Sequence, residues 1–359
     1  MPLRRLWLTN FRNYISADVT FGGGTTAITG SNGQGKTNLV EAIAWLARGS
    51  SFRGVPNEAL VRSGTDSAIL RAETGNPDRP TFLEVELVMR GRNRVQVNGD
   101  KLNRRRDLIG HLKATIFGPD DLTLLKGGPS ERRVFLDDLL VDLDSRLHAT
   151  RTDLERVIRQ RNTLLRQAGG RLTSEVSDTL DIWDIKFVEV GEALAAARRQ
   201  LVDRLSPLID NYLDGLSNGG SSAFLTYEDS WSESGLSSAL IGARNDDLRR
   251  GTTTVGPHRD EVSITLDDLG ARHHSSQGEQ RSLALAMRLA GHCLVDEHTG
   301  IKPVVLLDDV FSELDPDRSA ALVALLPKTQ AVLTSAEELP PGVVVDHQYR
   351  IAAGRVEVQ

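Results

Sequence analysis

The segment that most constrains this chain is a glycine-rich string near its start, GSNGQGKT at residues 30–37. It matches the pattern G-x-x-x-x-G-K-[ST] at every fixed position, between an expected strand at 26–29 and an expected helix at 38–46. Glycines let the backbone amides of such a loop turn toward an anion, and the start of the next helix adds partial positive charge. The string therefore predicts a phosphate-binding loop in an α/β fold.

Each position of this loop has an expected part in binding ATP and Mg²⁺. The backbone surrounds the phosphates, Lys36 places a charge on the β- and γ-phosphates, and the Thr37 hydroxyl binds the metal. We expect Lys36 to serve catalysis as well as binding. The expected nucleotide-binding residues are Gly30, Ser31, Asn32, Gly33, Gln34, Gly35, Lys36 and Thr37.

A second informative segment, PVVLLDD at 303–309, is an apolar run that ends in two carboxylates. It predicts a buried central strand that delivers its acids to the carboxyl edge of a parallel sheet, where ligands bind. Asp308 would hold Mg²⁺, directly or through water, and Asp309 would orient or deprotonate the attacking water. A strand followed by a solvated acidic turn is the alternative, and without the phosphate loop it would be preferred.

The string SSQGEQR at 275–281 precedes a helical pattern. A serine and a glycine at a helix start form a second anion site. One chain does not need two γ-phosphate sites for one nucleotide. A dimer does, because the serine and glycine of each subunit can cover the nucleotide of its partner. In isolation a plain helix cap is an equally good interpretation, and the order of the motifs along the chain favours the dimer.

This order of motifs resembles that of ABC-type ATPases, and within them the SMC/Rad50-like heads and the RecF family of recombination proteins. Further strings similar to that family are LTNFRNY at 8–14, SFR at 51–53, FGPDDL at 117–122, KGGPS at 126–130 and GPHRD at 256–260. The resemblance implies an α/β ABC-type P-loop ATPase head. It implies a signature that acts in trans at Ser276, Gln277, Gly278, Glu279 and Gln280, and a D-loop with Ser312 and Asp315.

Three departures from the general ABC pattern bear on catalysis. Asp309 stands where a glutamate is usual, and its side chain is one methylene shorter, so we expect poorer water positioning and slow turnover. Gln277 stands where transporters usually carry a glycine. The histidine expected after the next strand is missing, and Thr334 or Ser335 stands in its place.

The resemblance also implies a function. It implies an ATP-dependent DNA-binding protein of DNA replication and recombinational repair, with weak DNA-dependent ATPase activity. ATP would drive head-to-tail dimerisation on double-stranded DNA near single-strand gaps, and slow hydrolysis would release the dimer. RecO and RecR are the implied partners, which it would help to load RecA. Two other functions stay open: a nucleotide-gated structural DNA clamp with negligible hydrolysis, and a small-molecule P-loop enzyme.

The composition changes along the chain in a way that suggests a discontinuous head. Residues 1–125 and 217–359 carry the nucleotide motifs and many strand-like runs, whereas 126–216 carries helix-period patterns interrupted by two glycines. We expect an ATPase head with a helical insertion domain at 126–216. About ninety residues are too few for the long coiled coil of Rad50 or SMC proteins, so the insertion would be a short arm.

The formal net charge of −6 does not indicate a nucleic-acid binder, but binding depends on where the cations lie. Three arginines alternate from 90 to 94 ahead of an Asn-Gly hairpin turn, which predicts that they share one strand face. A solvated, salt-bridged surface is an equally good interpretation of this set. The candidate DNA contacts are Arg90, Arg92, Arg94, Arg104 and Arg105.

The GPHRD string has two possible interpretations. In GPHRD, His258 and Arg259 lie either near the phosphates or dimer seam, or in a rigid turn that enters a strand at 261–266.

The single cysteine, Cys293, argues against a disulfide framework. No apolar run reaches membrane-spanning length, and the first residues turn polar too soon for a signal peptide. We therefore expect a cytoplasmic protein with no membrane partner.

Overall fold

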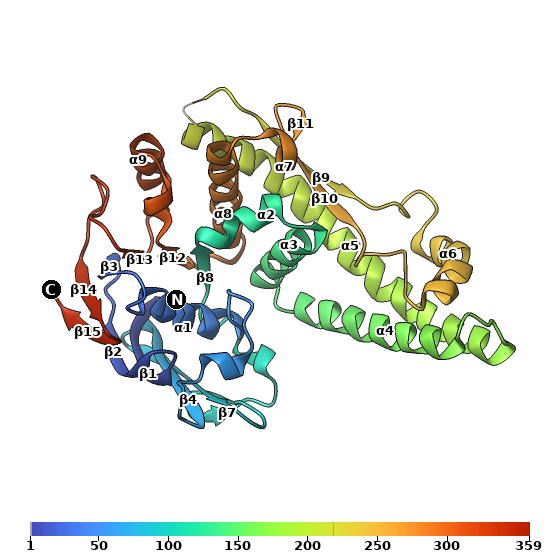
Figure 1. Cartoon of the computed structure of the whole chain (residues 1–359), viewed down its shortest axis with the longest axis horizontal. Helices are drawn as coiled ribbons and strands as arrows, with labels where there is room; N and C mark the ends of the chain where they lie inside the picture. Colours follow the sequence, from blue (N-terminus) through green and yellow to red (C-terminus); the bar gives the residue numbers. More distant parts are fainter. Residues whose placement is uncertain (1, 218) are drawn as a thin grey trace. The chain divides into compact units, whose positions relative to one another are not determined.

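The computed structural model describes residues 2–217 and 219–359, except for the side chains of Arg105 and Arg106. The chain forms two compact units (Figure 1). Unit 1 consists of Met1–Leu122, Asn211–Gly220 and Gln277–Gln359, and unit 2 of Thr123–Asp210 and Ser221–Ser276. The sequence placed all of 217–359 in the head, whereas the structure groups 221–276 with the helical unit. The reason is that the strands of this segment form a small sheet of their own.

Unit 1 is built around a six-stranded sheet in which the strand before the phosphate loop lies among strands from the end of the sequence. The order is β15-β14-β3-β13-β12-β8, and the neighbours are parallel except at the edge strand β15. The bounds are Thr25–Thr29 (β3), Ala114–Phe117 (β8), Val304–Asp308 (β12), Ala331–Ser335 (β13), His347–Ala352 (β14) and Arg355–Val358 (β15). Every residue of β8, β12 and β13 is buried, and for β12 this confirms the prediction from the apolar run at 303–309.

The parallel pairing brings several functional segments to one edge of this sheet. Asp308 at the end of β12 lies in register with Thr334 of β13, and Ser335 lies in register with Thr29 of β3. The phosphate loop follows β3 at the same edge and leads into α1 (Lys36–Arg48). Helix α1 is buried along most of its length in the core that also contains Leu306 and Val332 of the sheet.

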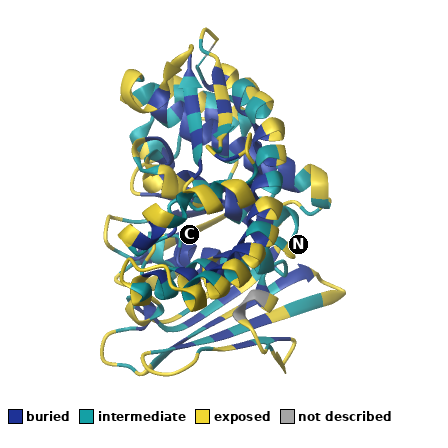
Figure 2. Cartoon of the chain, turned by 90° about the vertical axis from the view of Figure 1, so that its right-hand side faces the viewer, coloured by how far each residue is buried: buried dark blue, intermediate teal, exposed yellow. Residues whose placement is uncertain are grey.

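A second six-stranded sheet of unit 1 is antiparallel, in the order β2-β1-β4-β5-β6-β7. The bounds are Leu3–Phe11 (β1), Tyr14–Thr20 (β2), Ser67–Asn76 (β4), Arg79–Val88 (β5), Arg94–Val97 (β6) and Asp100–Lys101 (β7). Buried positions alternate with more accessible ones along β5 and β6, so one face packs on the core and the other is more accessible. Figure 2 colours the chain by this burial. Asn98 and Gly99 both have positive φ, which confirms the expected hairpin turn.

Unit 1 contains further helices besides α1. They are α8 (Gln277–Thr299), α9 (Pro316–Leu325) and the 3-10 helices η1 (Asn57–Leu60), η2 (Arg105–Leu108), η3 (Pro119–Leu122) and η4 (Val310–Glu313). His292 of α8 is 2% exposed, and its Nδ1 lies 3.0 Å from the hydroxyl of Thr115 in β8. Burial lowers the pKa of His292 to about 4. A neutral imidazole therefore joins α8 to the sheet.

Unit 2 is mainly helical. Its elements are α2 (Thr123–Lys126), α3 (Pro129–Leu143), α4 (Leu147–Ala168), most of α5 (Ser174–Ser217, of which the end from Asn211 is grouped with unit 1), α6 (Leu236–Arg250), α7 (Ala271–His274), β9 (Ala223–Glu228), β10 (Glu261–Leu266) and β11 (Leu269–Gly270). Gly169 and Gly170 both have positive φ and separate α4 from α5, as the glycine pair in the sequence indicated. Within the described residues, no helix combines the length and apolar character needed to cross a bilayer.

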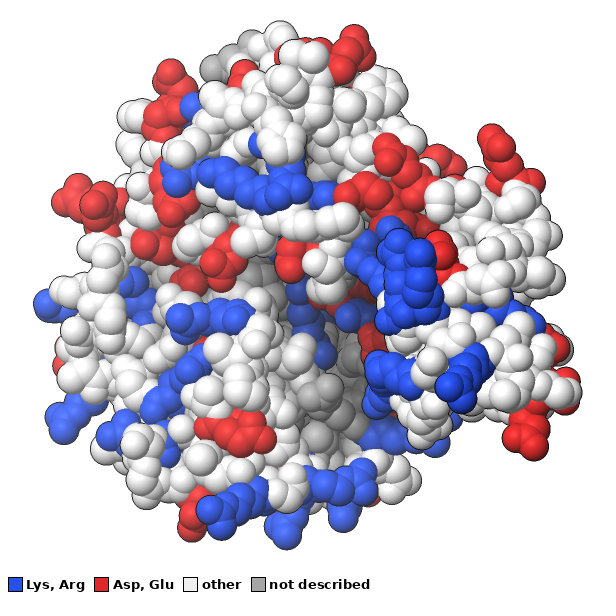
Figure 3. Space-filling view, turned by 45° about the vertical axis from the view of Figure 1, so that its right-hand side comes forward, with Lys and Arg blue, Asp and Glu red and all other residues white. Residues whose placement is uncertain are grey.

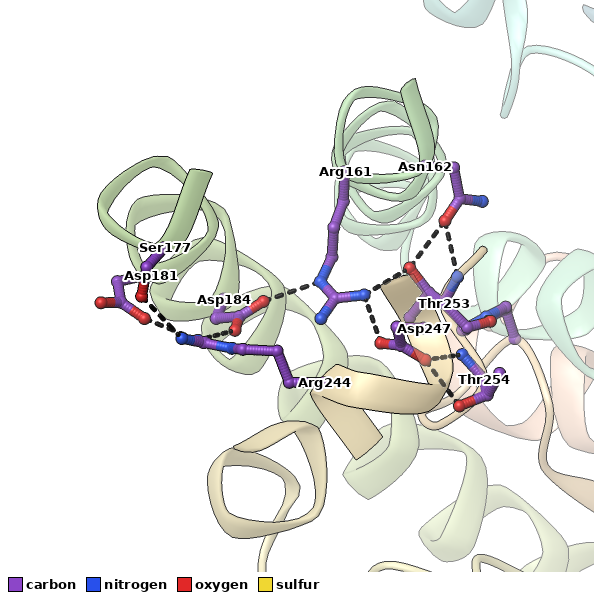
Figure 4. A network of polar contacts seen from close by, with 10 residues as sticks. Arg161, Asn162, Ser177, Asp181, Asp184, Arg244, Asp247, Thr253 and Thr254 are labelled. Atoms are coloured by element: carbon purple, nitrogen blue, oxygen red, sulfur yellow. Dashed lines mark hydrogen bonds and ion pairs between the residues drawn. The ribbon is translucent and has the colours of Figure 1, made fainter. Parts of the chain in front are cut away.

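A buried network of charged side chains joins α4, α5 and α6 of unit 2 (Figure 4). Arg161 of α4 is fully buried and donates to Asp184 of α5 at 2.7 Å and to Asp247 of α6 at 2.6 Å. Arg244 donates to the second oxygen of Asp184 at 2.7 Å, and Thr254 donates to Asp247 through both its backbone N–H and its hydroxyl. Each buried carboxylate thus has several partners, which offsets the cost of desolvating it.

The GPHRD string lies in unit 2 and serves its packing. Gly256 has a φ of +121°, and a Cβ there would lie 2.5 Å from the ring of Phe187. The His258 ring packs edge-on against Phe187, and its Nε2 lies 3.0 Å from the carbonyl oxygen of Thr253. Burial lowers the pKa of His258 to about 4. These contacts favour the rigid-turn interpretation of the string over a role at the phosphates.

Candidate nucleotide-binding site

The glycines of the phosphate loop are required by its backbone. Gly30, Gly33 and Gly35 all have positive φ. A Cβ on Gly30 would lie 2.4 Å from the carbonyl oxygen of Ile351, and one on Gly35 would lie 2.6 Å from the Asn13 side chain. Glycine tolerates both the φ values and the close approach. The spacing of the motif therefore follows from how this loop folds between β3 and α1.

Lys36 is held inside the loop. Its Nζ donates to the carbonyl oxygens of Gly30 at 2.6 Å and Ser31 at 3.1 Å, and to Asn32 Oδ1 at 3.4 Å. None of the described contacts of this ammonium is to a carboxylate. Burial lowers the pKa of Lys36, and the charges of Asp309 and Asp308 oppose that shift. A buried cation with uncharged acceptors fits an anionic ligand, which would supply the opposite charge.

Two oxygen ligands for a metal lie together beside the loop. Asp308 is 3% exposed, and its Oδ1 accepts hydrogen bonds from the hydroxyls of Thr37 at 3.0 Å and Thr334 at 2.9 Å. Burial raises the pKa of Asp308, while the two hydroxyl hydrogen bonds and the charge of Arg53 act in the opposite direction. Hard oxygen donors of this kind suit Mg²⁺, which takes few protein ligands and completes its shell with phosphate and water.

Asp309 follows with an unusual backbone. Its φ and ψ are 52° and 29°, in the left-handed region, and its N–H donates to Thr334 Oγ1 at 3.0 Å. Few residues with a side chain occupy this region, although aspartate tolerates it better than most. The Oδ1 of Asp309 is buried and has no hydrogen-bond partner among the described residues. An unpartnered buried carboxylate oxygen fits a site that receives a water molecule or a ligand donor.

The turn between β1 and β2 braces the phosphate loop, a role that the sequence did not reveal. Asn13 Nδ2 donates to the carbonyl oxygen of Gln34 at 2.7 Å, and its Oδ1 accepts from Asn38 at 2.9 Å. The Tyr14 hydroxyl donates to the carbonyl oxygen of Gly35 at 2.8 Å. No motif spacing links this turn to the loop. The one signal was the family-like string at 8–14.

The turn between β14 and β15 holds the loop as well. The backbone N–H of Ala353 donates to Gln34 Oε1 at 2.6 Å, and that of Gly354 donates to the Gln34 carbonyl oxygen at 3.2 Å. Gln34 is therefore fixed through both its backbone and its side chain. The loop is held in shape by segments from the two ends of the sequence.

The signature residues lie at the start of α8, which begins at Gln277. Ser276 and Gln277 are exposed, Gly278 and Glu279 are half-buried, and Gln280 is buried. The guanidinium of Arg318 covers Gly278, since a Cβ on this glycine would lie 2.9 Å from Arg318 Nη1. A side chain at this position would therefore have to displace the Arg318 guanidinium of the same subunit.

The D-loop residues make local contacts. The Ser312 hydroxyl donates to the carbonyl oxygen of Asp309 at 2.8 Å and closes the turn after β12. Asp315 caps α9 by accepting from the backbone N–H of Arg318 at 2.8 Å. The Arg318 side chain also pairs with Asp315 and donates to Ser282 of α8 at 3.1 Å. Arg318 thus joins the D-loop to the signature helix.

The expected arrangement of the candidate DNA contacts was wrong in part. Arg90 and Arg92 lie in the loop between β5 and β6, and only Arg94 lies on a strand, where it pairs with Glu86 at 3.3 Å. The strand is interrupted because Gly91 has a φ of +103° and the Asn93 side chain accepts from the N–H of Val88. The side chain of Arg105 lies outside the described part of the structure.

These arginines are nevertheless accessible. The side chains of Arg90, Arg92, Arg94 and Arg104 are exposed. On the face drawn in Figure 3, Lys and Arg side chains form several groups with acidic side chains among them, not one continuous basic surface. Charge distribution alone therefore leaves the DNA-contacting residues a prediction.

Known proteins similar to this chain include members of the family that its motifs resemble. The family model described as the RecF/RecN/SMC N terminal domain matches residues 2–338. A "DNA replication and repair protein RecF" of Acidothermus cellulolyticus is 38% identical over 370 residues, with 100% of both chains covered. One of Streptomyces avermitilis is 40% identical over 374 residues, with 99% of this chain and 100% of the relative covered. The chain belongs to the RecF family.

Solved structures agree with this membership. The structure described as the recombination mediator protein RecF-ATPrS in the RecFOR pathway is 31% identical to this RecF-family chain. It superposes with a TM-score of 0.91 and covers 99% of this chain and 98% of its own. An Smc head bound to the C-winged helix domain of ScpA has a TM-score of 0.60 at 18% identity, which shows a shared fold. The expected fold, an ABC-type ATPase head of the SMC class, is thereby confirmed.

Proposed function

We propose that this RecF-family chain is an ATP-dependent DNA-binding protein of recombinational repair and replication, and that it hydrolyses ATP slowly. The observation that carries the proposal is the convergence of Lys36, Thr37, Asp308 and Asp309 at one edge of the core sheet. The RecF structures described with ATP and ATPrS support ATP as the nucleotide. Mg²⁺ is part of the proposal because two oxygen donors lie together beside the loop.

When bound, ATP and Mg²⁺ would supply the transferable phosphoryl group and neutralise part of its charge. The chain would contribute the rest. The loop amides and Lys36 bind the phosphates, and Thr37 and Asp308 hold the metal. Asp309, whose Oδ1 has no hydrogen-bond partner in the described part of the chain, orients a water molecule and accepts its proton. The left-handed backbone of Asp309 sets the direction of its short side chain, which a usual glutamate would extend by one methylene.

We further propose that two copies close head to tail, so that Ser276 and Gly278 of one copy face the nucleotide of the other. The support is that Ser276 is exposed at the start of α8, where a second copy can reach it. ATP would then stabilise the dimer by binding both copies at once. Closure would form or complete the surface for duplex DNA near a single-strand gap.

Molar mass in solution tests the dimer directly. Light scattering with a slowly hydrolysed ATP analogue and Mg²⁺ should give twice the mass found without nucleotide, and a gapped duplex should strengthen the effect. The Ser276→Arg variant should bind nucleotide as a monomer and stay a monomer. An unchanged mass of the unmodified chain at saturating analogue would overturn the proposed dimer.

DNA and protein partners complete the proposal. The family relationship supports duplex DNA, RecO and RecR as partners, RecA loading as the outcome, and a cytoplasmic location. A filter-binding titration with duplex DNA should show tighter binding with ATP than without it. Binding that is indifferent to nucleotide and lost at modest salt would instead favour a small-molecule P-loop enzyme.

A structural clamp with negligible hydrolysis is the second candidate, because Asp309 is shorter than the usual glutamate. Single-turnover hydrolysis by the unmodified chain and by Asp309→Asn separates the two functions. The ATPase proposal expects a loss of activity in the variant, of about 100-fold or more. Equal residual hydrolysis rates in both proteins would favour the structural clamp over the ATPase.

A further inference from the structure

The hydroxyl of Thr334 lies between the two acids of the site. It donates to Asp308 Oδ1 at 2.9 Å and accepts from the backbone N–H of Asp309 at 3.0 Å. Thr334 is 1% exposed at the end of β13, in register with Asp308 on the neighbouring strand. A threonine hydroxyl has a single proton to donate, and here the carboxylate of Asp308 receives it.

The neighbouring hydroxyl is engaged in the same way. Ser335 Oγ donates to the carbonyl oxygen of Glu337 at 2.9 Å and accepts from the N–H of Glu337 at 3.1 Å. Ser335 therefore closes a local turn after β13. The donor protons of both candidate replacements for the missing histidine are engaged by protein oxygens. Neither hydroxyl, as placed here, keeps a proton available for a phosphate.

We propose that Thr334 is a positioning residue that couples the metal-binding acid to the water-orienting acid. The inference rests on the proposed function. Through its donor bond, Thr334 holds the same Asp308 oxygen that accepts from Thr37. Through its acceptor bond, it holds the N–H of Asp309 in the left-handed turn that directs the short carboxylate. One oxygen atom thus links the orientations of both acids.

The link has a chemical consequence. A metal held by Asp308 would compete for the oxygen that accepts from Thr334, and the same hydroxyl would then shift its hold on Asp309. Metal occupancy and water orientation would therefore change together. Without the hydroxyl, Asp309 would lose the partner of its backbone N–H, and its turn would relax toward commoner backbone conformations.

Two substitutions at Thr334 and one at its neighbour test this role. Thr334→Val removes the hydroxyl with little change in volume, Thr334→Ser keeps it, and Ser335→Ala is the matched control. The first measurement is the Mg²⁺ concentration that half-saturates binding of a fluorescent ATP analogue, together with the affinity of that analogue without Mg²⁺. The second is the single-turnover rate of hydrolysis.

In Thr334→Val, we expect the half-saturating Mg²⁺ concentration to rise and the hydrolysis rate to fall, each by about 10-fold to 100-fold. Affinity for the analogue without Mg²⁺ should change less than about twofold, and Thr334→Ser and Ser335→Ala should stay near the unmodified chain. If Thr334→Val does not fold, Thr334→Ala carries the same expectations.

A Thr334→Val protein with an unchanged Mg²⁺ response and an unchanged rate would overturn the inference. So would an equal loss in Ser335→Ala, because that result would reflect a general effect on the end of β13. If the unmodified chain hydrolyses no ATP, the proposed ATPase fails, and the Mg²⁺ response still decides the role of Thr334.

Discussion

Acid should destabilise unit 1 through His292, and His292→Gln should remove most of that effect. The imidazole is 2% exposed, its Nδ1 lies beside the Thr115 hydroxyl, and its Nε2 is buried without a described partner. Burial lowers its pKa from 6.5 to about 4, so the folded protein holds the ring neutral. In the unfolded chain the same ring is protonated at a higher pH.

The direction and size of the pH effect on the free energy of unfolding follow from this pKa difference. A lowered folded pKa contributes stability above about pH 6.5, and that contribution is lost as the pH falls toward 4. At about 1.4 kcal/mol per pKa unit, the full loss is roughly 3 kcal/mol, of which about 2 kcal/mol is lost by pH 5. The loss is a large fraction of the usual stability of a folded domain.

Urea unfolding at pH 7 and pH 5, followed by tryptophan fluorescence and circular dichroism, measures the effect. The unmodified chain should lose about 2 kcal/mol more than His292→Gln between these pH values. Comparing the two proteins removes the contribution of His258, since both contain it. His298→Gln, an exposed histidine of the same helix, is the matched control and should behave like the unmodified chain.

Equal pH dependence in the unmodified chain and His292→Gln would refute the reasoning. That result would mean that the buried ring accepts a proton as readily as it does in the unfolded chain. The junction of α8 with β8 would then have to admit water or move.

Three other perturbations have defined outcomes. Arg161→Ala leaves Asp247 buried without its cation and should lower the free energy of unfolding by about 3–5 kcal/mol. Arg159 is exposed on the same helix, and Arg159→Ala should change the free energy of unfolding by less than about 0.5 kcal/mol. Thermal unfolding of the two variants tests this difference. Asn13→Ala removes two hydrogen bonds that brace the loop and should weaken ATP-analogue binding by about 5-fold to 30-fold in a fluorescence titration, and unchanged affinity would contradict the bracing role. Lys36→Arg keeps the charge but not its shape, so analogue binding should persist while ATP-dependent dimers or hydrolysis are lost; normal turnover in this variant would contradict the role given to Lys36.

Local patterns predicted the elements that carry the site. The strand before the phosphate loop, the helix after it and the buried strand that ends at Asp308 were all readable, because their apolar periodicity and glycine spacing reflect local backbone requirements. The parallel arrangement placed Asp308 at the same edge as the loop. Membership of the RecF family and the ABC-type fold agree with the resemblance that these motifs carried.

What the sequence left out depends on contacts between distant segments. The bonds from Asn13 to the loop and from Thr334 to both acids arise only after the sheet has formed. The positive φ of Asp309 has no sequence signal, since aspartate also occupies ordinary conformations. A strand extending through Arg90 was expected from alternation alone, and Gly91 broke it. The sequence also gave no sign that 221–276 groups with the helices.

The position of β3 has a consequence for synthesis. This strand lies between β13 and β14, and its loop is clasped by Ala353 and Gly354, all of which are translated some three hundred residues later. A growing chain must therefore carry β3 without its strand neighbours, and α1 without β12 and β13, while the helices of unit 2 leave the ribosome. During that interval their apolar surface needs shelter, by a chaperone or by transient non-native packing. We therefore expect the phosphate loop to be fully braced only after the turn between β14 and β15 has been translated.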